Sequence, residues 1–484
     1  MRRPRPACRV RPRSLSSGDS KTMPDPLLRT LRCRNSHRPG VLGRLATAIG
    51  ASGANIGDIR TVWSGPEHIV RDLDVIVEDA ESLARTLAVL QELEGVDVIE
   101  VIDDVHEFHI DGKLEVRATH PVRSIHDLRR VYTPGVAEVV RTIVAKPDES
   151  YVFTIRGKTV AIVTNGTRVL GLGNVGPVAS LPVMEGKAAL LHQFVNLSAF
   201  PIVLDTRDPD EIVDTVLRIA KGFGAIQLED IESPVCFEVE KRLVEALEMP
   251  VLHDDQHGTA VAALAATENA MARAGLRLAE AQVGVLGLGA AGTAIARMLG
   301  VATDRPVLGF DPAPAARERL AQLGGRPVAS QAELLAGCDV LIATSGRAGI
   351  IPASQVRKGQ GILALTNPEP EIRPEDALAA GAAFAADGRS VNNLLGFPGI
   401  LRAAIDCRAR RITQSMYLAA SRAIAGLARE NELVPNPLRL DVHAAVARAV
   451  AHAAEAAGVA RQQVPSDYML ESDPFRALRG PVKS

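Results

Sequence analysis

The sequence has little of several features that mark whole classes of protein. Aromatic side chains make up only 3% of the 484 residues, and 55 basic side chains nearly balance 57 acidic ones. This balance argues against a nucleic-acid partner, because proteins that bind nucleic acids carry a basic stripe. No apolar run approaches the ~18 residues that a membrane-spanning helix needs, so we expect no membrane partner either.

Cysteine is scarce as well. There are five cysteines, and no two of them lie at Cys-x-x-Cys spacing. An odd number without such a pair argues against a disulfide framework and a zinc site, and it favours a reducing cytoplasm. The cysteines are Cys8, Cys33, Cys236, Cys338 and Cys407.

The length and apolar content predict several domains with buried cores. At roughly 150 residues per domain, 484 residues suggest about three domains. Residues 1–26 are rich in arginine, contain no acid before Asp19 and are interrupted by prolines. We interpret them as a disordered tail or a misplaced start, with Met23 as a later start; a transit peptide is the alternative.

Residues 27–103 are predicted to alternate as strand, helix, strand, strand, helix and strand, which is a ferredoxin-like order. With its RPGVLG turn and NIGDI strand, this segment resembles an ACT domain, a regulatory module that senses small molecules. The resemblance implies that Gly40, Gly43 and Gly57 leave room for an effector, often an amino acid, where two such domains meet. The alternative is that these glycines only serve backbone turns.

The rest of the chain reads as α/β structure followed by helices. We predict a linker, a first α/β domain, a second α/β domain and a helical C-terminal part, at residues 104–120, 121–268, 269–400 and 401–484.

A glycine-rich turn in the second α/β domain predicts a dinucleotide site. Gly287, Gly289 and Gly292 stand at GxGxxG spacing between an apolar strand and a helix, so the turn can bring a pyrophosphate to the helix N-terminus. The next strand ends in Asp311, which would hydrogen-bond the ribose hydroxyls of NAD and repel the 2′-phosphate of NADP. The alternative for Asp311 is a helix cap or turn residue.

Two acidic pairs in the first α/β domain predict a metal site. Glu229 and Asp230 end one apolar strand, and Asp254 and Asp255 follow another. Carboxylates gathered at strand ends suit a hard cation such as Mg²⁺ or Mn²⁺. Each pair alone is more often a cap or a loop, and the histidines beside the second pair are too few to favour zinc.

A lysine and a tyrosine complete the candidate chemistry. Lys187 follows a glycine-rich loop and is expected at the start of an alanine-rich helix, where the helix dipole would favour the neutral amine and make it a base. The alternative is a surface lysine. Tyr132 precedes a Thr-Pro-Gly turn; a lone tyrosine is usually a core residue.

These segments, in this order, resemble the bacterial malic enzyme family from roughly Gly112 to Ala460. The matching stretches are YTPGVAEV, TNGTRVLGLGNVGPVASLPVMEGKAALL, LEDIESPVCFEVEKRL, HDDQHGTAVAALAA, GLGAAGTAIA, TNPEPEI and NNLLGFPGILRAAI. The resemblance implies a Rossmann-type doubly wound NAD domain, an α/β substrate domain, and NAD-dependent oxidative decarboxylation of L-malate to pyruvate. An ACT-like domain before such a core resembles a known subgroup, and both resemblances imply a homodimer or higher homo-oligomer.

The resemblance also implies a role for particular residues. It implies that Tyr132 is the general acid and Lys187 the general base. The implied metal ligands are Glu229, Asp230 and Asp255. Arg168 is implied to bind a substrate carboxylate, and Asn367 and Asn393 to contact substrate and nicotinamide. The sequence departs from the family pattern at Asn165, where an aspartate is common, and in a shortened loop, ADGRSVNN, before Asn393.

Three other functions compete with this one. An oxaloacetate decarboxylase that does not use NAD is disfavoured by the intact glycine turn. A non-catalytic ACT-type sensor is disfavoured by the complete set of acid, base and metal ligands. A 2-hydroxy-acid dehydrogenase without decarboxylation is disfavoured by the lysine and metal segments.

Overall fold

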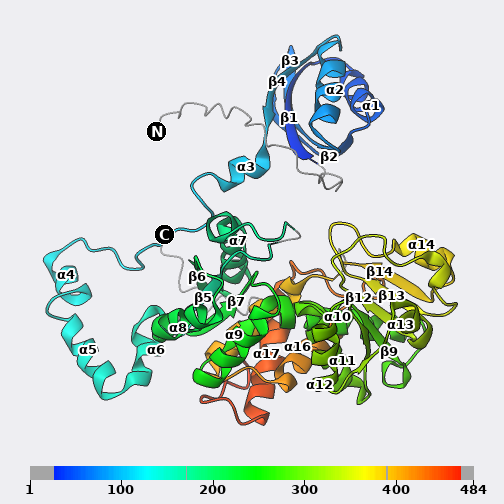
Figure 1. Cartoon of the computed structure of the whole chain (residues 1–484). Helices are drawn as coiled ribbons and strands as arrows, with labels where there is room; N and C mark the ends of the chain where they lie inside the picture. Colours follow the sequence, from blue (N-terminus) through cyan, green and yellow to red (C-terminus); the bar gives the residue numbers. More distant parts are fainter. Residues whose placement is uncertain (1–26, 170–171, 389–390, 470–484) are drawn as a thin grey trace. The chain divides into compact units, whose positions relative to one another are not determined.

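The computed structural model describes residues 27–169, 172–388 and 391–469, and these divide into two compact units on either side of Ile110 (Figure 1). The predicted N-terminal tail lies outside the described residues. No described helix combines the length and the apolar character needed to cross a bilayer.

The first unit is an antiparallel sheet with two helices on one face. Its strands are ordered β2-β3-β1-β4, and its core is formed by Leu31, Leu45, Ile49, Leu73 and Leu90. A third helix lies inside the predicted linker. The elements are β1 (Leu27–Ser36), α1 (Val41–Ala51), β2 (Asn55–Ser64), β3 (His68–Val77), α2 (Ala80–Gln91), β4 (Val96–Ile102) and α3 (Asp104–His109).

The second unit contains a four-stranded parallel sheet, ordered β6-β5-β7-β8. Alternate residues of β5 face opposite layers: Val160 packs in a cluster with Met184 of α7, and Ala161 packs in a cluster with Val216 of α8. Helices therefore cover both faces, which explains why the strand sequences are continuously apolar. The elements are β5 (Thr159–Thr164), α7 (Pro177–Val195), β6 (Ser198–Val203), α8 (Pro209–Ile219), β7 (Ala225–Leu228), α9 (Val235–Ala246), β8 (Val251–His253) and α10 (Asp254–Arg273).

A six-stranded parallel sheet follows, ordered β11-β10-β9-β12-β13-β14. The chain order reverses between β9 and β12, which is the doubly wound arrangement of a Rossmann-type domain, and this prediction is confirmed. The elements are β9 (Val283–Leu286), α11 (Ala290–Thr303), β10 (Leu308–Phe310), α12 (Pro314–Gln322), β11 (Arg326–Pro327), α13 (Gln331–Gly337), β12 (Val340–Ala343), β13 (Gly361–Ala364), α14 (Pro374–Ala379) and β14 (Phe384–Asp387).

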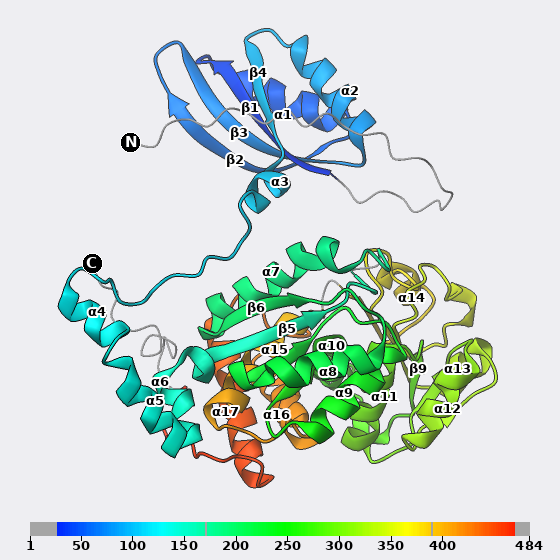
Figure 2. The same ribbon diagram turned by 60° about the vertical axis from the view of Figure 1, so that its left-hand side comes forward.

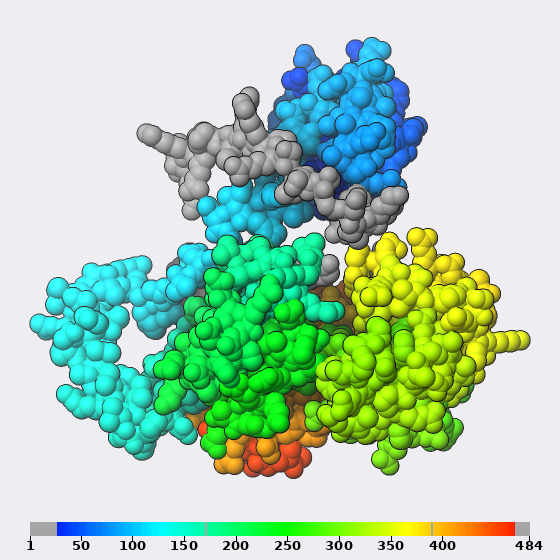
Figure 3. Space-filling view, viewed as in Figure 1, coloured from blue at the N-terminus to red at the C-terminus, as the bar shows by residue number. Residues whose placement is uncertain are grey.

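The last helices, α15 (Phe397–Asp406), α16 (Gln414–Ala425) and α17 (Leu440–Ala456), complete a core that both parallel sheets share. Val160 of β5, Val285 of β9 and Phe397 of α15 belong to one buried cluster. Figure 2 shows α10 and α11 lying between the two sheets, and in Figure 3 the green and yellow segments form one continuous surface. The two sheets are thus held together by packing.

Three helices of the second unit have no buried side chain. They are α4 (Ile125–Val131), α5 (Val136–Ala145) and α6 (Ser150–Phe153), and we call residues 125–153 the arm. Apolar side chains of the arm are exposed, including Ile125, Val131, Val140 and Val144. Such a segment lacks the burial that ordinarily stabilises a helix in a protein.

Candidate active site

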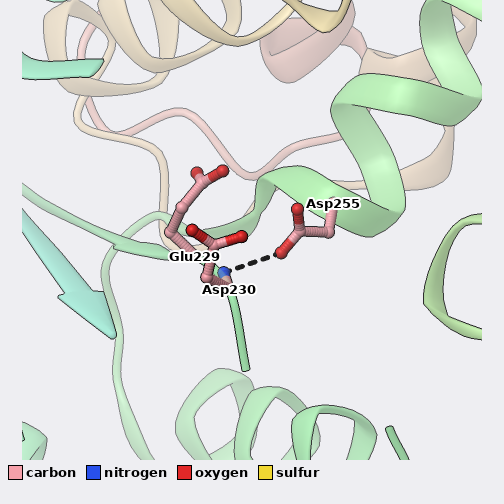
Figure 4. A group of neighbouring side chains, drawn as sticks. All are labelled: Glu229, Asp230 and Asp255. Carbon is pink, nitrogen blue, oxygen red and sulfur yellow. Dashed lines mark hydrogen bonds between the residues drawn. The ribbon is translucent and has the colours of Figure 1, made fainter. Parts of the chain in front are cut away.

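Three carboxylates meet where the first parallel sheet ends. Glu229 and Asp230 follow β7, and Asp255 lies in the first turn of α10 (Figure 4). One oxygen from each lies within 4.8 Å of the others, and the Asp230 backbone N–H donates to Asp255 Oδ2 at 2.9 Å. Asp230 adopts a left-handed φ of 53°, and its buried Oδ2 has no hydrogen-bond partner. An orphaned oxygen among three acids fits the oxygen-rich shell of Mg²⁺ or Mn²⁺.

The charge of this cluster is poorly compensated. Burial, with the neighbouring acids, raises the pKa of Asp230 to about 9. Burial also raises the pKa of Glu229 to about 7 and that of Asp255 to about 6, although the nearby Lys187 opposes both shifts. Carboxylates that resist ionisation because they are buried together are stabilised as anions by a bound cation.

Lys187 lies beside this cluster, but the expected reason for its reactivity is wrong. Helix α7 begins at Pro177, so Lys187 is in the middle of the helix and not at its N-terminus. Its Nζ lies 3.1 Å from Glu229 Oε1 and forms an ion pair with Asp254. Burial lowers the pKa of Lys187, but the charges of Asp254 and Glu229 outweigh burial, and the pKa is raised overall. The two neighbouring acids therefore favour the charged form of the lysine.

Asp254 contacts Lys187 and Asn393, a role that was not predicted from the sequence. The side chain is fully buried, and its Oδ2 accepts hydrogen bonds from Lys187 and, at 2.8 Å, from Asn393 Nδ2. Burial raises its pKa to about 6. Successive side chains on a helix point about 100° apart, so Asp255 faces the carboxylates while Asp254 faces the lysine. The Asp-Asp pair thus serves two groups, and Asn393 is joined to the site through Asp254.

The glycine turn has the shape of a dinucleotide cradle. A Cβ on Gly292 would lie 1.8 Å from the carbonyl oxygen of Gly287, whereas a Cβ on Gly289 would meet no atom within 4 Å. The missing side chain at Gly292 permits close packing of the helix against the turn, and the missing side chain at Gly289 leaves open space over the turn. Asp311 lies against this turn: Oδ2 accepts from the Leu288 N–H and Oδ1 from the Ala313 N–H, each at 2.8 Å. Asp311 therefore caps a turn as well as marking the predicted ribose position.

Arg168 and Asn367 lie on loops at the sheet edges. The Arg168 N–H donates to the carbonyl oxygen of Asp230 at 3.1 Å, and the exposed side chain is close enough for its charge to lower the pKa of Asp255. Asn367 is exposed and follows β13, and a Cβ on Gly388 would lie 2.7 Å from its Nδ2. Arg168 is therefore beside the acids, and Asn367 is at the carboxyl end of the dinucleotide sheet.

Asn165, the departure from the family pattern, supports the loop that carries Arg168. Its Oδ1 accepts from Thr167 Oγ1 at 2.6 Å, and its Nδ2 donates to the carbonyl oxygen of Thr206 at 3.1 Å. A carboxylate could not make the second bond, because it has no N–H to donate. The amide at this position therefore has a structural use of its own.

Tyr132 is the predicted site residue that the structure does not bring to the others. It caps the C-terminus of α4 and is 67% exposed. Among the described residues, no contact links its hydroxyl with Lys187 or the acids. The arm that carries Tyr132 is the segment with no buried side chain.

A glycine cradle on a doubly wound sheet, in the same compact unit as a half-buried lysine and three clustered acids, defines a dinucleotide-binding α/β enzyme. Residues 111–244 match the model for the malic enzyme N-terminal domain, and residues 248–346 match that for the NAD-binding domain of D-isomer-specific 2-hydroxyacid dehydrogenases. The chain is 52% identical over 429 residues to NAD-dependent malic enzyme 1 of Bacillus subtilis, covering 88% of this chain and 98% of that one.

Other relatives agree with this assignment. NAD-dependent malic enzyme of Geobacillus stearothermophilus is 42% identical, with 86% of this chain and 92% of that one covered. The crystal structure of malic enzyme from Pyrococcus horikoshii is similar with a TM-score of 0.72 and 39% identity, covering 78% of this chain and 96% of that one. The chain belongs to the malic enzyme family.

Proposed function

We propose that this protein oxidises and decarboxylates L-malate to pyruvate and CO₂ while NAD⁺ is reduced to NADH, with Mg²⁺ or Mn²⁺ as the metal. The observation that carries the proposal is the contact of the half-buried Lys187 with the buried Asp254 and Glu229, next to two further acids. A plain NAD-dependent dehydrogenase needs no such carboxylate cluster. A cation held by these acids would stabilise the negative charge that loss of CO₂ leaves on the product.

The residues divide into binding and proton-transfer groups. Glu229, Asp230 and Asp255 would hold the cation, which when bound supplies Lewis-acid polarisation of the substrate oxygens. Arg168 would grip a substrate carboxylate with its planar fork. The glycine turn and Asp311 would hold the dinucleotide, and Asn367 and Asn393 would orient substrate and nicotinamide, as the family resemblance implies.

Lys187 would take the proton of the malate hydroxyl as hydride leaves the same carbon. The charges of Asp254 and Glu229 hold the lysine proton, so the amine becomes available once those carboxylates are neutralised. Asp254 receives a hydrogen bond from Lys187 and is placed to share this proton. After CO₂ is lost from the resulting keto acid, Tyr132 would protonate the carbon of the enolate that remains, which gives pyruvate.

We also propose that two copies of the chain pair through the arm, and that Tyr132 acts in the site of the partner subunit. Exposed apolar side chains on α4 and α5, none of them buried, support a second copy as the occupant of this surface. A Tyr132 that is 67% exposed in its own chain agrees with this arrangement.

Mixing two inactive variants tests the shared site. In a mixture of Tyr132→Phe and Lys187→Ala chains that is unfolded and refolded together, half of the dimers are mixed, and each mixed dimer has one intact site. We expect roughly a quarter of wild-type activity to return. If each chain supplied its own Tyr132 and Lys187, no activity would return.

Residues 27–103 are proposed to be an ACT domain that binds a small effector. The element order and the antiparallel sheet support this, and the 88% of the chain aligned with the Bacillus subtilis enzyme is more than the second unit alone contains. Asn35, before the turn at Gly40, is fully buried and neither amide atom has a partner. We expect a free amino acid to raise the thermal stability of the wild type but not of Asn35→Leu. An unchanged response in Asn35→Leu would remove Asn35 from the effector site.

The assay for the main function compares the two coenzymes. Purified protein is given L-malate and Mn²⁺ with NAD⁺ or NADP⁺, and reduced coenzyme and pyruvate are both measured. Equal amounts of NADH and pyruvate are the expected result. Reduced coenzyme without pyruvate would indicate a plain dehydrogenase. In a parallel reaction with oxaloacetate in place of malate, pyruvate formation by a protein that does not oxidise malate would indicate a decarboxylase. The domain boundaries given above and a cytoplasmic location stay predictions.

A further inference from the structure

Another buried carboxylate lies in the dinucleotide domain, in the segment between β13 and α14. Glu371 is fully buried, and its Oε1 accepts from the Ser345 N–H at 2.7 Å, from Ser345 Oγ at 2.9 Å and from Thr366 Oγ1 at 2.5 Å. Its Oε2 accepts from the Thr366 N–H at 3.3 Å. One side chain therefore binds backbone and hydroxyl donors of two different loops.

These two loops follow neighbouring strands of the sheet. Ser345 lies just after β12 and Thr366 just after β13, and the two strands pair in parallel. Further bonds tighten the junction: the Gly346 N–H donates to Thr366 Oγ1 at 3.0 Å, and the Ile351 N–H donates to the carbonyl oxygen of Glu371 at 3.0 Å. Both loops thus depend on one buried anion for their spacing.

Each loop touches a part of the predicted site. A Cβ on Gly287 would lie 2.7 Å from Ser345 Cα, so the first loop packs directly against the glycine turn. The second loop carries Asn367, the residue after Thr366. Ligands bind at the carboxyl ends of such strands, where the chain order reverses. The spacing that Glu371 sets is therefore the spacing between the dinucleotide cradle and the substrate-facing asparagine.

The charge of Glu371 has a cost and a benefit. A neutral amide at this position would cost less free energy to remove from water than a carboxylate does. Burying a carboxylate is unfavourable unless donors satisfy it, and here four donors converge on it. Hydrogen bonds to an ionised acceptor are shorter and stronger than neutral ones, so the carboxylate holds the loops more stiffly than an amide would.

We infer that Glu371 is a positioning residue, which fixes the loops after β12 and β13 so that the nicotinamide ring and the reacting carbon of the substrate keep the separation needed for hydride transfer. The inference rests on the proposed NAD-dependent oxidation. Glu371 is fully buried and bonded to both loops, so we expect it to act through their geometry. Misplacement by about 1 Å can slow a reaction on the order of a hundredfold, even when binding is little changed.

The test compares Glu371→Gln with a matched control on the same segment. The amide can keep the oxygen that accepts three of the four bonds, so this variant should fold. Glu375→Gln is the control, because Glu375 is an exposed acid in the first turn of α14. For each protein, turnover with malate, turnover with malate deuterated at C2, the dissociation constant of NADH and thermal unfolding are measured.

We expect Glu371→Gln to lower turnover about tenfold and to raise the deuterium isotope effect, because a longer transfer distance makes hydride transfer more rate-limiting. NADH affinity should change less than about threefold, since most binding contacts lie elsewhere. Glu375→Gln should match the wild type. A variant that was only destabilised would lose active molecules and keep the wild-type isotope effect.

Two results separate the possible failures. A wild type that reduces no NAD⁺ with malate overturns the proposed function. An active wild type, together with a Glu371→Gln variant of equal isotope effect, overturns the role of Glu371. If Glu371→Gln does not fold, Ser345→Ala removes one hydroxyl donor from the same carboxylate, and an unchanged isotope effect in that variant overturns the inference as well.

Discussion

Two glycines of the same turn should respond in opposite ways to the same substitution. In Gly292→Ala the new methyl group would lie 1.8 Å from the carbonyl oxygen of Gly287 and 2.8 Å from Thr344 Oγ1. Ordinary contacts of a methyl carbon begin at about 3.5 Å, so the turn has to move by more than an ångström. Overpacking of this kind costs about 1–3 kcal/mol, and we expect a loss near the upper value in the free energy of unfolding.

Gly289→Ala should leave the fold intact and weaken dinucleotide binding. Its φ of -70° is open to alanine, and the new methyl group would meet no protein atom within 4 Å. Because Gly289 caps α11, alanine should cost less than about 1 kcal/mol of stability. The methyl group would instead occupy the space that a pyrophosphate enters, and we expect NADH to bind at least about tenfold more weakly, or 1.4 kcal/mol.

Urea unfolding and NADH fluorescence titration measure the two effects separately. The expected pattern is a destabilised Gly292→Ala and a stable Gly289→Ala with poor NADH affinity. Equal stability of the two variants would refute the packing argument. Unchanged NADH affinity in a stable Gly289→Ala would show that the pyrophosphate does not approach this turn.

Four further outcomes are expected. Lys187→Ala should lower turnover roughly 10²- to 10⁴-fold with little change in NADH affinity, and a wild-type rate would remove the lysine from the mechanism. Mn²⁺ at a hundred times its dissociation constant should stabilise the wild type by about 2.7 kcal/mol in thermal unfolding, and Asp255→Asn should lose this gain; equal gains would move the metal elsewhere. Asp311→Ser should raise the rate with NADP⁺ relative to NAD⁺, because a carboxylate repels the 2′-phosphate; an unchanged ratio would leave Asp311 as a turn residue alone. Burial lowers the pKa of His443 to about 4, so the neutral histidine contributes its full stabilisation above about pH 6.5. About 3 kcal/mol of the free energy of unfolding is lost as the pH falls from 6.5 towards 4. In His443→Gln the free energy of unfolding should fall less steeply over this range, and an equal slope would contradict this assignment.

The regular elements were predicted well because their signals are local. The glycine turn between an apolar strand and a helix predicted β9 and α11, and period-two alternation predicted β2 and β3. The clustering of Glu229, Asp230 and Asp255 was also predicted, since the carboxyl ends of parallel strands meet at one edge of a sheet. Their role as metal ligands stays a prediction.

The predicted start of α7 was wrong, and the reason is also local. The glycine-rich loop was expected to continue up to Lys187 and the helix to begin there. The helix in fact begins at Pro177, and Pro182 removes only one backbone donor near the start of a long helix. The pKa of Lys187 was therefore argued from the wrong cause, because its neighbouring acids and not the helix dipole decide it.

The roles of Asp254 and Glu371 could not be found in the sequence. Asp254 meets Asn393 across 139 positions, and Glu371 meets Ser345 across 26. No periodicity or spacing rule encodes such a meeting, because it depends on how strands are ordered in the sheet. Patterns predict which side chains reach an edge, and tertiary packing decides which of them touch.

The arm has a consequence for how the protein is made. Its helices precede β5 in the chain, so they leave the ribosome before the sheet of the second unit exists. Since none of their side chains is buried in one chain, the proposed pairing would be the step that removes their apolar surface from water. Assembly of the dimer would then be second order in chain concentration. At low chain concentration or slow translation, the protein would stay longer as an unpaired chain that is prone to aggregate.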